Sequence, residues 1–260
     1  MAVENVVVTC VQYLPLRGPS LRWQHPAVDD GPAFPLVAVG VTMHGSRAAL
    51  DADIALLRAG SRSDRTLEKR VDVYFSADVE TDGPIPGPYS LLSFALVYAG
   101  RFDGSRFERP ASLDRTFYRE LRPISDDFEP EALKVNGLDR ERLRREGELP
   151  SSAMTAASEW IQSLANGGDP VLVAYPLSFD WPWLYWYFVR FSKHGSPFNH
   201  SRCFDIKTAF AVKAGRPIAD SGRSQLLPDL MSKRVHTHHA LDDAKEQAEI
   251  FANLFEWRGP

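Results

Sequence analysis

The chain has 260 residues, 44% of them apolar and 25% charged, so it is long enough for one large folded domain with a substantial core. Its formal net charge of -4 excludes a global basic field, so polyanion binding would need a local patch or bound metal. No apolar run approaches the ~20 residues that span a bilayer, and two cysteines give no disulfide framework, so we expect a cytoplasmic protein without a membrane segment.

Residues 1–70 differ in composition from the rest of the chain. Five prolines lie between Pro15 and Pro35, and only residues 48–59 have the spacing of an amphipathic helix. No set of candidate catalytic residues occurs here. We expect either a poorly ordered N-terminal extension or translated sequence upstream of the natural start, followed by a catalytic domain at residues 71–260.

From Val71 onward, short apolar segments alternate with turn residues and amphipathic stretches. We predict strands at 71–79, 91–98, 115–121 and 171–175, and helices at 130–135, 151–165, 180–191 and 239–257. Ser151 and Ser152 are the candidate caps of the second helix, and an irregular stretch precedes the last one. The first three strands indicate an antiparallel meander, and the fourth is apolar throughout, as in a strand buried on both faces. This order predicts an α/β fold, with a mixed sheet flanked by helices.

The first strand runs into the sequence D-V-E-T-D-G at residues 78–83. Asp78 and Glu80 are two residues apart, so in a strand they point to the same face. Like charges on a buried face repel and are costly to desolvate, and a hard divalent cation is their natural partner. We expect Thr81 and Gly83 to end the strand and open a loop that a substrate can approach. The alternative is an exposed acidic strand end before a turn.

Asp180 follows the buried strand where a helix N-cap is expected, with Pro182 in the first turn. A simple cap is the plainer interpretation of an isolated aspartate. However, open α/β sheets bind ligands at the carboxyl ends of their strands, which favours a functional role. The aromatic residues that follow are more typical of core packing than of base stacking.

The last helix carries two adjacent aspartates that helical phase separates. Asp243 shares a face with Gln247, Ile250 and Leu254 and therefore turns toward the sheet, where a carboxylate needs a partner such as a metal ion. Asp242 shares a face with Lys245, Glu246 and Glu249, which we interpret as a solvated surface. His238 lies five residues before Asp243 and can overhang the same site, whereas we interpret His239 as a bystander or cap.

These motifs, in this order, resemble those of the DEDDh exonucleases of the ribonuclease H-like superfamily, which include ribonuclease T and the proofreading subunit of bacterial DNA polymerase III. The resemblance covers residues 71–257, and residues 117–138 look like the family's segment between its first two motifs. The bacterial exoribonuclease-like branch is the most similar. The resemblance implies a ribonuclease H-like mixed sheet flanked by helices.

Matched by position, Asp78 and Glu80 form the first motif, Asp180 the second, and His238 with Asp243 the third. The family often has Asn four residues before the second-motif aspartate. Pro176 occupies that place here, which puts the positioning of Asp180 and of the nucleotide in doubt.

The activity that the resemblance implies is 3′–5′ exonucleolytic hydrolysis of phosphodiester bonds in single-stranded nucleic acid, with RNA slightly favoured over DNA. Two Mg²⁺ or Mn²⁺ ions about 3.5–4 Å apart would activate water and stabilise the leaving oxygen. Their implied ligands are the four acidic residues Asp78, Glu80, Asp180 and Asp243. His238 would take the proton from the attacking water.

The backbone at Thr81 and Gly83 is expected to contact the terminal nucleotide. The arginines within residues 140–145 are candidates for phosphate contacts, but their acidic neighbours favour a solvated helix. The alternative function is a non-catalytic nucleic-acid-binding or scaffolding module on the same fold. A homodimer stays open.

Overall fold

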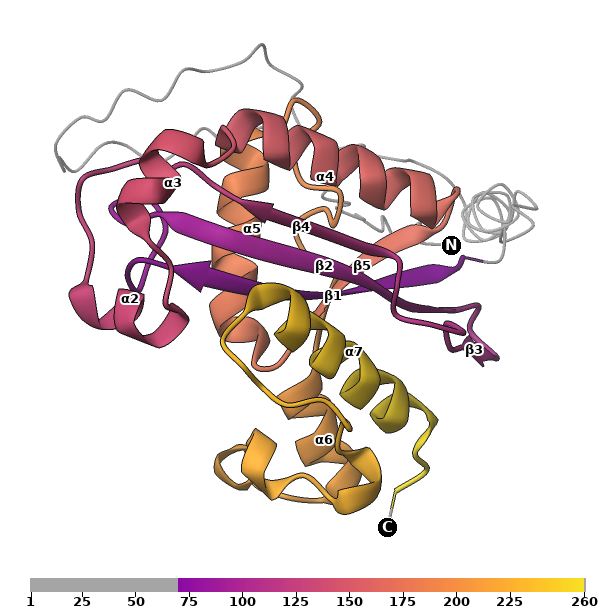
Figure 1. Ribbon diagram of the computed structural model, residues 1–260. Coiled ribbons are helices and arrows are strands. Elements are labelled where there is room, and N and C mark those ends of the chain that lie inside the picture. Colours follow the sequence, from indigo (N-terminus) through magenta and orange to yellow (C-terminus); the bar gives the residue numbers. More distant parts are fainter. Residues whose placement is uncertain (1–69, 260) are drawn as a thin grey trace, which may run out of the picture. The chain divides into compact units, whose positions relative to one another are not determined.

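The computed structural model describes residues 70–259, which form a six-stranded mixed sheet with helices on both faces (Figure 1). The predictions for residues 1–69 lie outside the described residues. The strands are β1 (Asp72–Thr81), β2 (Leu91–Phe102), β3 (Phe107–Glu108), β4 (Thr116–Glu120), β5 (Asp169–Ala174) and β6 (Cys203–Asp205). The α-helices are α2 (Pro130–Asn136), α3 (Arg140–Glu146), α4 (Pro150–Ala165), α5 (Leu177–Phe191), α6 (Ile206–Ala214) and α7 (Ala240–Glu256). Three 3₁₀ turns, η1 (Ile218–Asp220), η2 (Arg223–Gln225) and η3 (Pro228–Leu230), connect α6 to α7.

The strands lie in the order β3-β2-β1-β5-β6, and β4 pairs with β2 beside β3. β1 and β2 are antiparallel, as are β2 and β4, which is the predicted meander. β5 is parallel to both β1 and β6, so the sheet is mixed, as expected from the sequence. Two strands end later than predicted. β1 continues through Thr81, with a register shift between Glu80 and Thr81 against β2, and β2 continues through Phe102.

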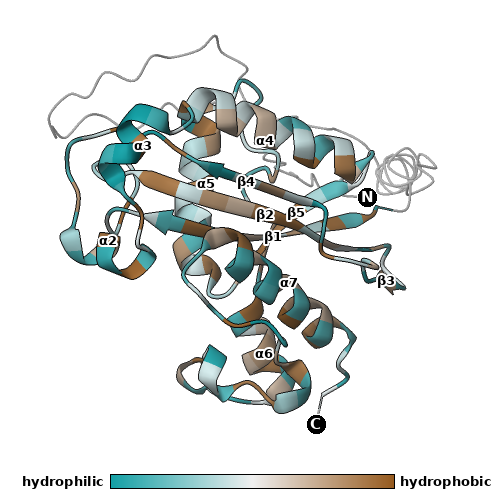
Figure 2. Ribbon diagram, viewed as in Figure 1, coloured by the Kyte–Doolittle hydropathy of each residue, from teal (hydrophilic) through white to brown (hydrophobic). Residues whose placement is uncertain are grey.

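Alternation along β1 sends its side chains into two separate cores. Val73, Phe75, Ala77 and Val79 belong to the core shared with α4 and α5, whereas Tyr74 belongs to the core shared with α7. Figure 2 shows apolar residues concentrated along the central strand β2, between these layers. The same alternation directs the even-numbered residues Asp78 and Glu80 toward the α7 side of the sheet.

Two helices begin earlier than predicted. α4 starts at Pro150, and its N-cap is Leu149, so Ser151 and Ser152 lie inside the helix. α5 starts at Leu177 after Pro176, so Asp180 is a first-turn residue and not the N-cap. In both cases a proline near the start fixes the backbone, and no side-chain cap is needed.

The stretch before the last helix is more ordered than expected, because it contains β6 and α6. Both elements extend the fold at the β5 side of the sheet, where β6 pairs with β5. No helix among residues 70–259 has the length and apolarity required to cross a membrane.

The helix of residues 140–146 is present, but its first arginine is not solvated. Arg140 is 4% exposed, and its Nε donates to Asp82 Oδ2 at 2.8 Å. Its Nη2 donates to the Ser125 carbonyl at 2.6 Å. The sequence pattern failed here because the partner lies 58 residues away in the chain. This buried ion pair ties α3 to the loop that follows β1.

Candidate active site

Asp78, Glu80 and Asp243 converge where β1 faces α7. One carboxylate oxygen from each lies within 4.8 Å of the others. Asp243 is fully buried, and Glu80 is 9% exposed. The Nε2 group of Gln247, one helical turn after Asp243, donates to Asp78 Oδ1 at 2.7 Å. The sequence placed Gln247 on the same face as Asp243 but gave no sign of this contact with β1.

Asp180 reaches the same place from α5. It is 4% exposed, and its Oδ1 accepts a hydrogen bond from the Val79 backbone N–H at 3.2 Å. The donor residue lies between Asp78 and Glu80 in β1, so this hydrogen bond holds the Asp180 carboxylate beside theirs. Pro176 precedes the helix and lines the same cleft, so the departure from the family pattern leaves Asp180 beside the other carboxylates.

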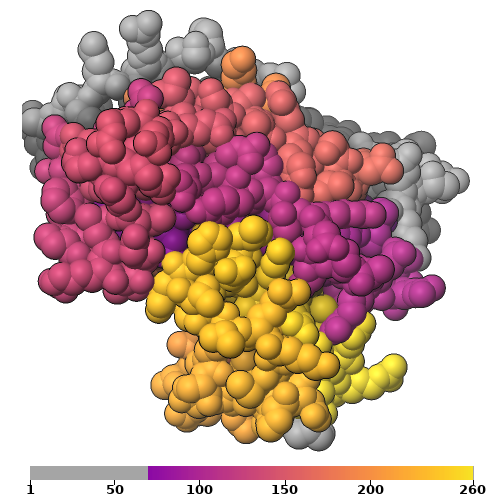
Figure 3. Space-filling model, viewed as in Figure 1, coloured from indigo at the N-terminus to yellow at the C-terminus, as the bar shows by residue number. Residues whose placement is uncertain are grey.

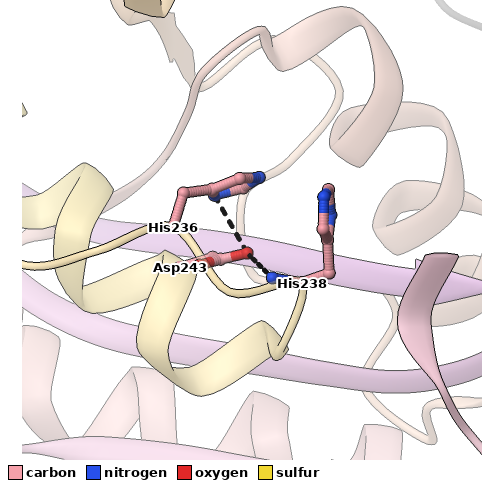
Figure 4. A group of neighbouring side chains, drawn as sticks. All are labelled: His236, His238 and Asp243. Atoms are coloured by element: carbon pink, nitrogen blue, oxygen red, sulfur yellow. Dashed lines mark hydrogen bonds and ion pairs between the residues drawn. The ribbon is translucent and has the colours of Figure 1, made fainter.

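The loop before α7 is organised around Asp243 (Figure 4). Asp243 Oδ1 accepts from the Thr237 N–H, and Oδ2 accepts from the His238 N–H, both at 2.8 Å. His238 has a φ of 58°, in the left-handed region, and its ring centroid lies 4.6 Å from that of His236. His236 Nδ1 lies 3.0 Å from Asp243 Oδ2. His236 was not predicted as a site residue, although it lies only two residues before His238, and this spacing could have pointed to it.

Crowding and burial change the proton affinity of this cluster. Burial, reinforced by Asp243 and Asp180, raises the pKa of Glu80 to about 8. Burial also raises the pKa of Asp180 to about 8. The pKa of Asp78 is raised well above its usual value by burial and then by the neighbouring carboxylates, an effect that Arg223 opposes.

These carboxylates line a cleft of about 590 Å³. In the space-filling view, indigo atoms of β1 are visible between the α2–α3 region and the yellow α7 (Figure 3). The lining is strongly acidic and includes all four predicted aspartate and glutamate residues, together with Glu129 and Glu131. It also contains apolar groups from the loop after β1, from α2 and from α5: Pro84, Ala132, Val135 and Phe179. The cleft therefore offers both charged and apolar groups to one ligand.

Thr81 and Gly83 both line this cleft, but the local contacts differ from the expected open loop. The Thr81 hydroxyl donates to the Gly83 carbonyl at 2.8 Å, and Asn136 Nδ2 donates to the Thr81 carbonyl at 3.0 Å. A Cβ added at Gly83 would clash with the Tyr89 ring. Glycine is therefore required here by the packing of Tyr89. Whether either residue contacts a nucleotide stays a prediction.

Two further residues of the site had been assigned elsewhere or overlooked. Glu246 is 6% exposed, and its Oε2 lies 3.2 Å from Arg223 Nε. The assignment of Glu246 to a solvated face was wrong, because the chain around η2 covers that side of α7. Asp242 is exposed, as predicted. Arg223 lies between α6 and α7, where no pattern distinguished it.

The donor set suits hard divalent cations. Three clustered carboxylates and Asp180 provide oxygen ligands, which Mg²⁺ and Mn²⁺ prefer. Their raised pKa values show that full ionisation is unfavourable without additional positive charge. A bound cation would supply this charge, so the residues fit the predicted metal site.

Comparison with known proteins places this site in a family. A family model described as "Exonuclease" matches residues 77–251, more than half of the chain. The 3′–5′ DNA exonuclease Cap18 of Escherichia coli is 34% identical over 181 residues, which cover 69% of this chain and 90% of Cap18. The nuclease domain of 3′hExo, a DEDDh family member bound to rAMP, superposes with a TM-score of 0.53 at 13% identity, covering 73% of this chain and 93% of that one. A 3′-exonuclease solved for recognition of the histone mRNA stem-loop also gives a TM-score of 0.53, at 12% identity, covering 81% and 73%. The protein therefore belongs to the exonuclease family, with the ribonuclease H-like fold, and is a nuclease of the hydrolase class, as the resemblance to DEDDh exonucleases implied.

Proposed function

We propose that the protein is a metal-dependent 3′–5′ exonuclease that shortens single-stranded DNA from its 3′ end. The observation that supports this best is the convergence of Asp78, Glu80, Asp180 and Asp243 at one cleft, with His238 at its edge. Divalent cations at such a site supply Lewis acidity, which eases deprotonation of the attacking water and stabilises the departing oxygen.

The proposed roles follow from where the side chains lie. Asp78, Glu80 and Asp243 hold the cations, and Asp180 completes the set from α5. His238 is exposed at the rim, so its ring can meet a water molecule that approaches the scissile bond, and imidazole is suited to accept that proton near neutral pH. The hydrogen bond from its backbone to Asp243 fixes the base relative to the cations.

The cleft is suited to a single unpaired nucleotide. Its volume of about 590 Å³ lies within the range of small-ligand pockets. The sugar and phosphate would lie beside the acidic groups, near Thr81 and Gly83, while the base packs against Val135 and Phe179. A duplex end would first have to unpair, which costs free energy. Single-stranded ends are therefore the preferred substrate.

DNA is proposed over RNA because of the similarity to Cap18, whose name gives DNA as its substrate. This proposal replaces the slight preference for RNA that the sequence suggested. The comparisons do not support the homodimer that the sequence left open. A cytoplasmic location stays a prediction from the cysteine content.

The test uses matched single-stranded DNA and RNA oligonucleotides that carry a 5′ label. With Mg²⁺ or Mn²⁺, the protein should produce a ladder that shortens one nucleotide at a time from the 3′ end, faster on DNA. Chelation by EDTA and the variant Asp78→Asn should each abolish the ladder. Oligonucleotide binding without any shortening would instead support the non-catalytic module.

A further inference from the structure

Arg223 occupies an unusual place for a cation. Among the described residues that line the cleft, it is the only arginine or lysine, whereas the acidic residues there include Glu129 and Glu131 in addition to the proposed metal ligands. Its charge opposes the raised pKa of Asp78 and acts on Asp180 and Glu246 as well. The guanidinium therefore lies near the carboxylates that are proposed to hold the cations.

The side chain is held from two sides. Arg223 Nε lies 3.2 Å from Glu246 Oε2, and the guanidinium carbon lies 5.4 Å from the centroid of the Tyr175 ring. The Tyr175 hydroxyl in turn donates to the Ser221 carbonyl at 2.8 Å, which anchors the chain just before Arg223 to the end of β5. A long side chain that is fixed in this way loses little further entropy when it binds a ligand.

These anchors leave part of the guanidinium unused. Nη2 has no hydrogen-bond partner among the described residues, and the side chain remains 28% exposed. Arginine donors are arranged to meet phosphate oxygens in pairs. A buried guanidinium nitrogen without a partner favours a ligand oxygen at this place in the cleft.

We propose that Arg223 binds a backbone phosphate of the DNA strand whose 3′ end occupies the cleft, and that Glu246 is a positioning residue for it. This inference rests on the proposed function. Its role would be to offset the repulsion between the polyanion and the acidic lining. The alternative is that Arg223 only neutralises Glu246 and touches no substrate.

The test pairs Arg223→Gln with single-stranded DNA oligonucleotides in which one phosphate near the 3′ end, outside the scissile bond, is replaced by a neutral methylphosphonate. When the methylphosphonate replaces the phosphate that Arg223 binds, a charge-assisted contact is lost. The wild-type kcat/KM should then fall by about 10- to 100-fold, and only at that position. The kcat/KM of Arg223→Gln on unmodified DNA should be lower than that of the wild type by a similar factor. Methylphosphonate at the position that slows the wild type should not lower it further. Arg216→Gln is the matched control, because Arg216 also stacks on an aromatic ring and bonds the same connecting segment but does not line the cleft.

Full methylphosphonate sensitivity of Arg223→Gln at every position would overturn the inference. If this variant does not fold, Arg223→Lys in the same scan keeps the charge and should show a reduced loss at the same position only.

Binding measured by anisotropy separates this inference from the proposed function. Even if the protein did not hydrolyse DNA, the slope of log Kd against log salt should fall by about 0.7 in Arg223→Gln, as expected for one lost contact to a single strand. An unchanged slope would count against a phosphate contact.

Discussion

Replacing Glu80 by glutamine should stabilise the metal-free protein, although Glu80 is proposed as a metal ligand. Its pKa is raised from the model-peptide value near 4.5 to about 8 by burial and by the adjacent Asp243 and Asp180. The folded protein therefore holds a proton that the unfolded chain has lost, so stability falls as pH rises from about 4.5 through about 8. At pH 7.5 this difference corresponds to about 4 kcal/mol, and at pH 5.5 to only about 1 kcal/mol. Glutamine has nearly the same shape and never ionises, so it avoids the cost.

The assay is thermal unfolding in EDTA at pH 5.5 and pH 7.5. For a domain of this size, about 4 kcal/mol corresponds to a rise in Tm of roughly 8–16 °C at pH 7.5, and the gap should shrink several-fold at pH 5.5. Glu108→Gln is the matched control, since Glu108 is also on a strand but exposed. Saturating Mn²⁺ should then raise the Tm of the wild type more than that of Glu80→Gln. A variant no more stable than the wild type, or a gap that widens at the lower pH, would refute the reasoning.

Three further perturbations test other parts of the site. His238→Ala should lower turnover by about 10²–10⁴-fold while keeping the Mn²⁺-induced rise in Tm, whereas His239→Ala should leave both unchanged. Equal turnover of the wild type and His238→Ala from pH 6 to 9 would remove His238 as the base. Asp82→Asn should lower the free energy of unfolding, measured in urea, by about 3–5 kcal/mol, because it leaves the Arg140 guanidinium buried without its charged partner. A loss below about 1 kcal/mol would contradict this. Gln247→Leu should weaken Mn²⁺ binding about 10- to 100-fold by calorimetry, since it removes the hydrogen bond that orients Asp78; unchanged affinity would mean that this contact is incidental.

Periodicity was enough to predict the faces on which three of the acidic residues lie, and the family resemblance implied that they meet. The spacing of two in β1 put Asp78 and Glu80 on one face, and helical phase turned Asp243 toward the sheet and Asp242 away from it. The antiparallel meander and the mixed sheet followed from the same patterns. The motif order supplied Asp180, even though the start of its helix was misplaced by the assumption that the aspartate was a cap.

Contacts between distant segments could not be predicted in this way. Arg140 and Glu246 both lie in helices with alternating charges, a pattern typical of solvated faces, yet each is buried against a partner from another part of the chain. Arg223 belongs to a connecting segment without periodicity, so only the folded chain reveals that it faces the cleft. Periodicity within a helix or strand shows on which face a residue lies. These contacts depend on which other segment of the chain packs on that face.

The central claim is that four carboxylates from β1, α5 and α7 together hold divalent cations. It is tested most directly by diffraction from crystals soaked in Mn²⁺, with anomalous difference maps calculated at the manganese edge. The account predicts strong peaks within coordinating distance of Asp78, with Glu80, Asp180 and Asp243 around them, and loss of these peaks in Asp78→Asn. Saturating Mn²⁺ without an anomalous peak beside Asp78 would contradict it.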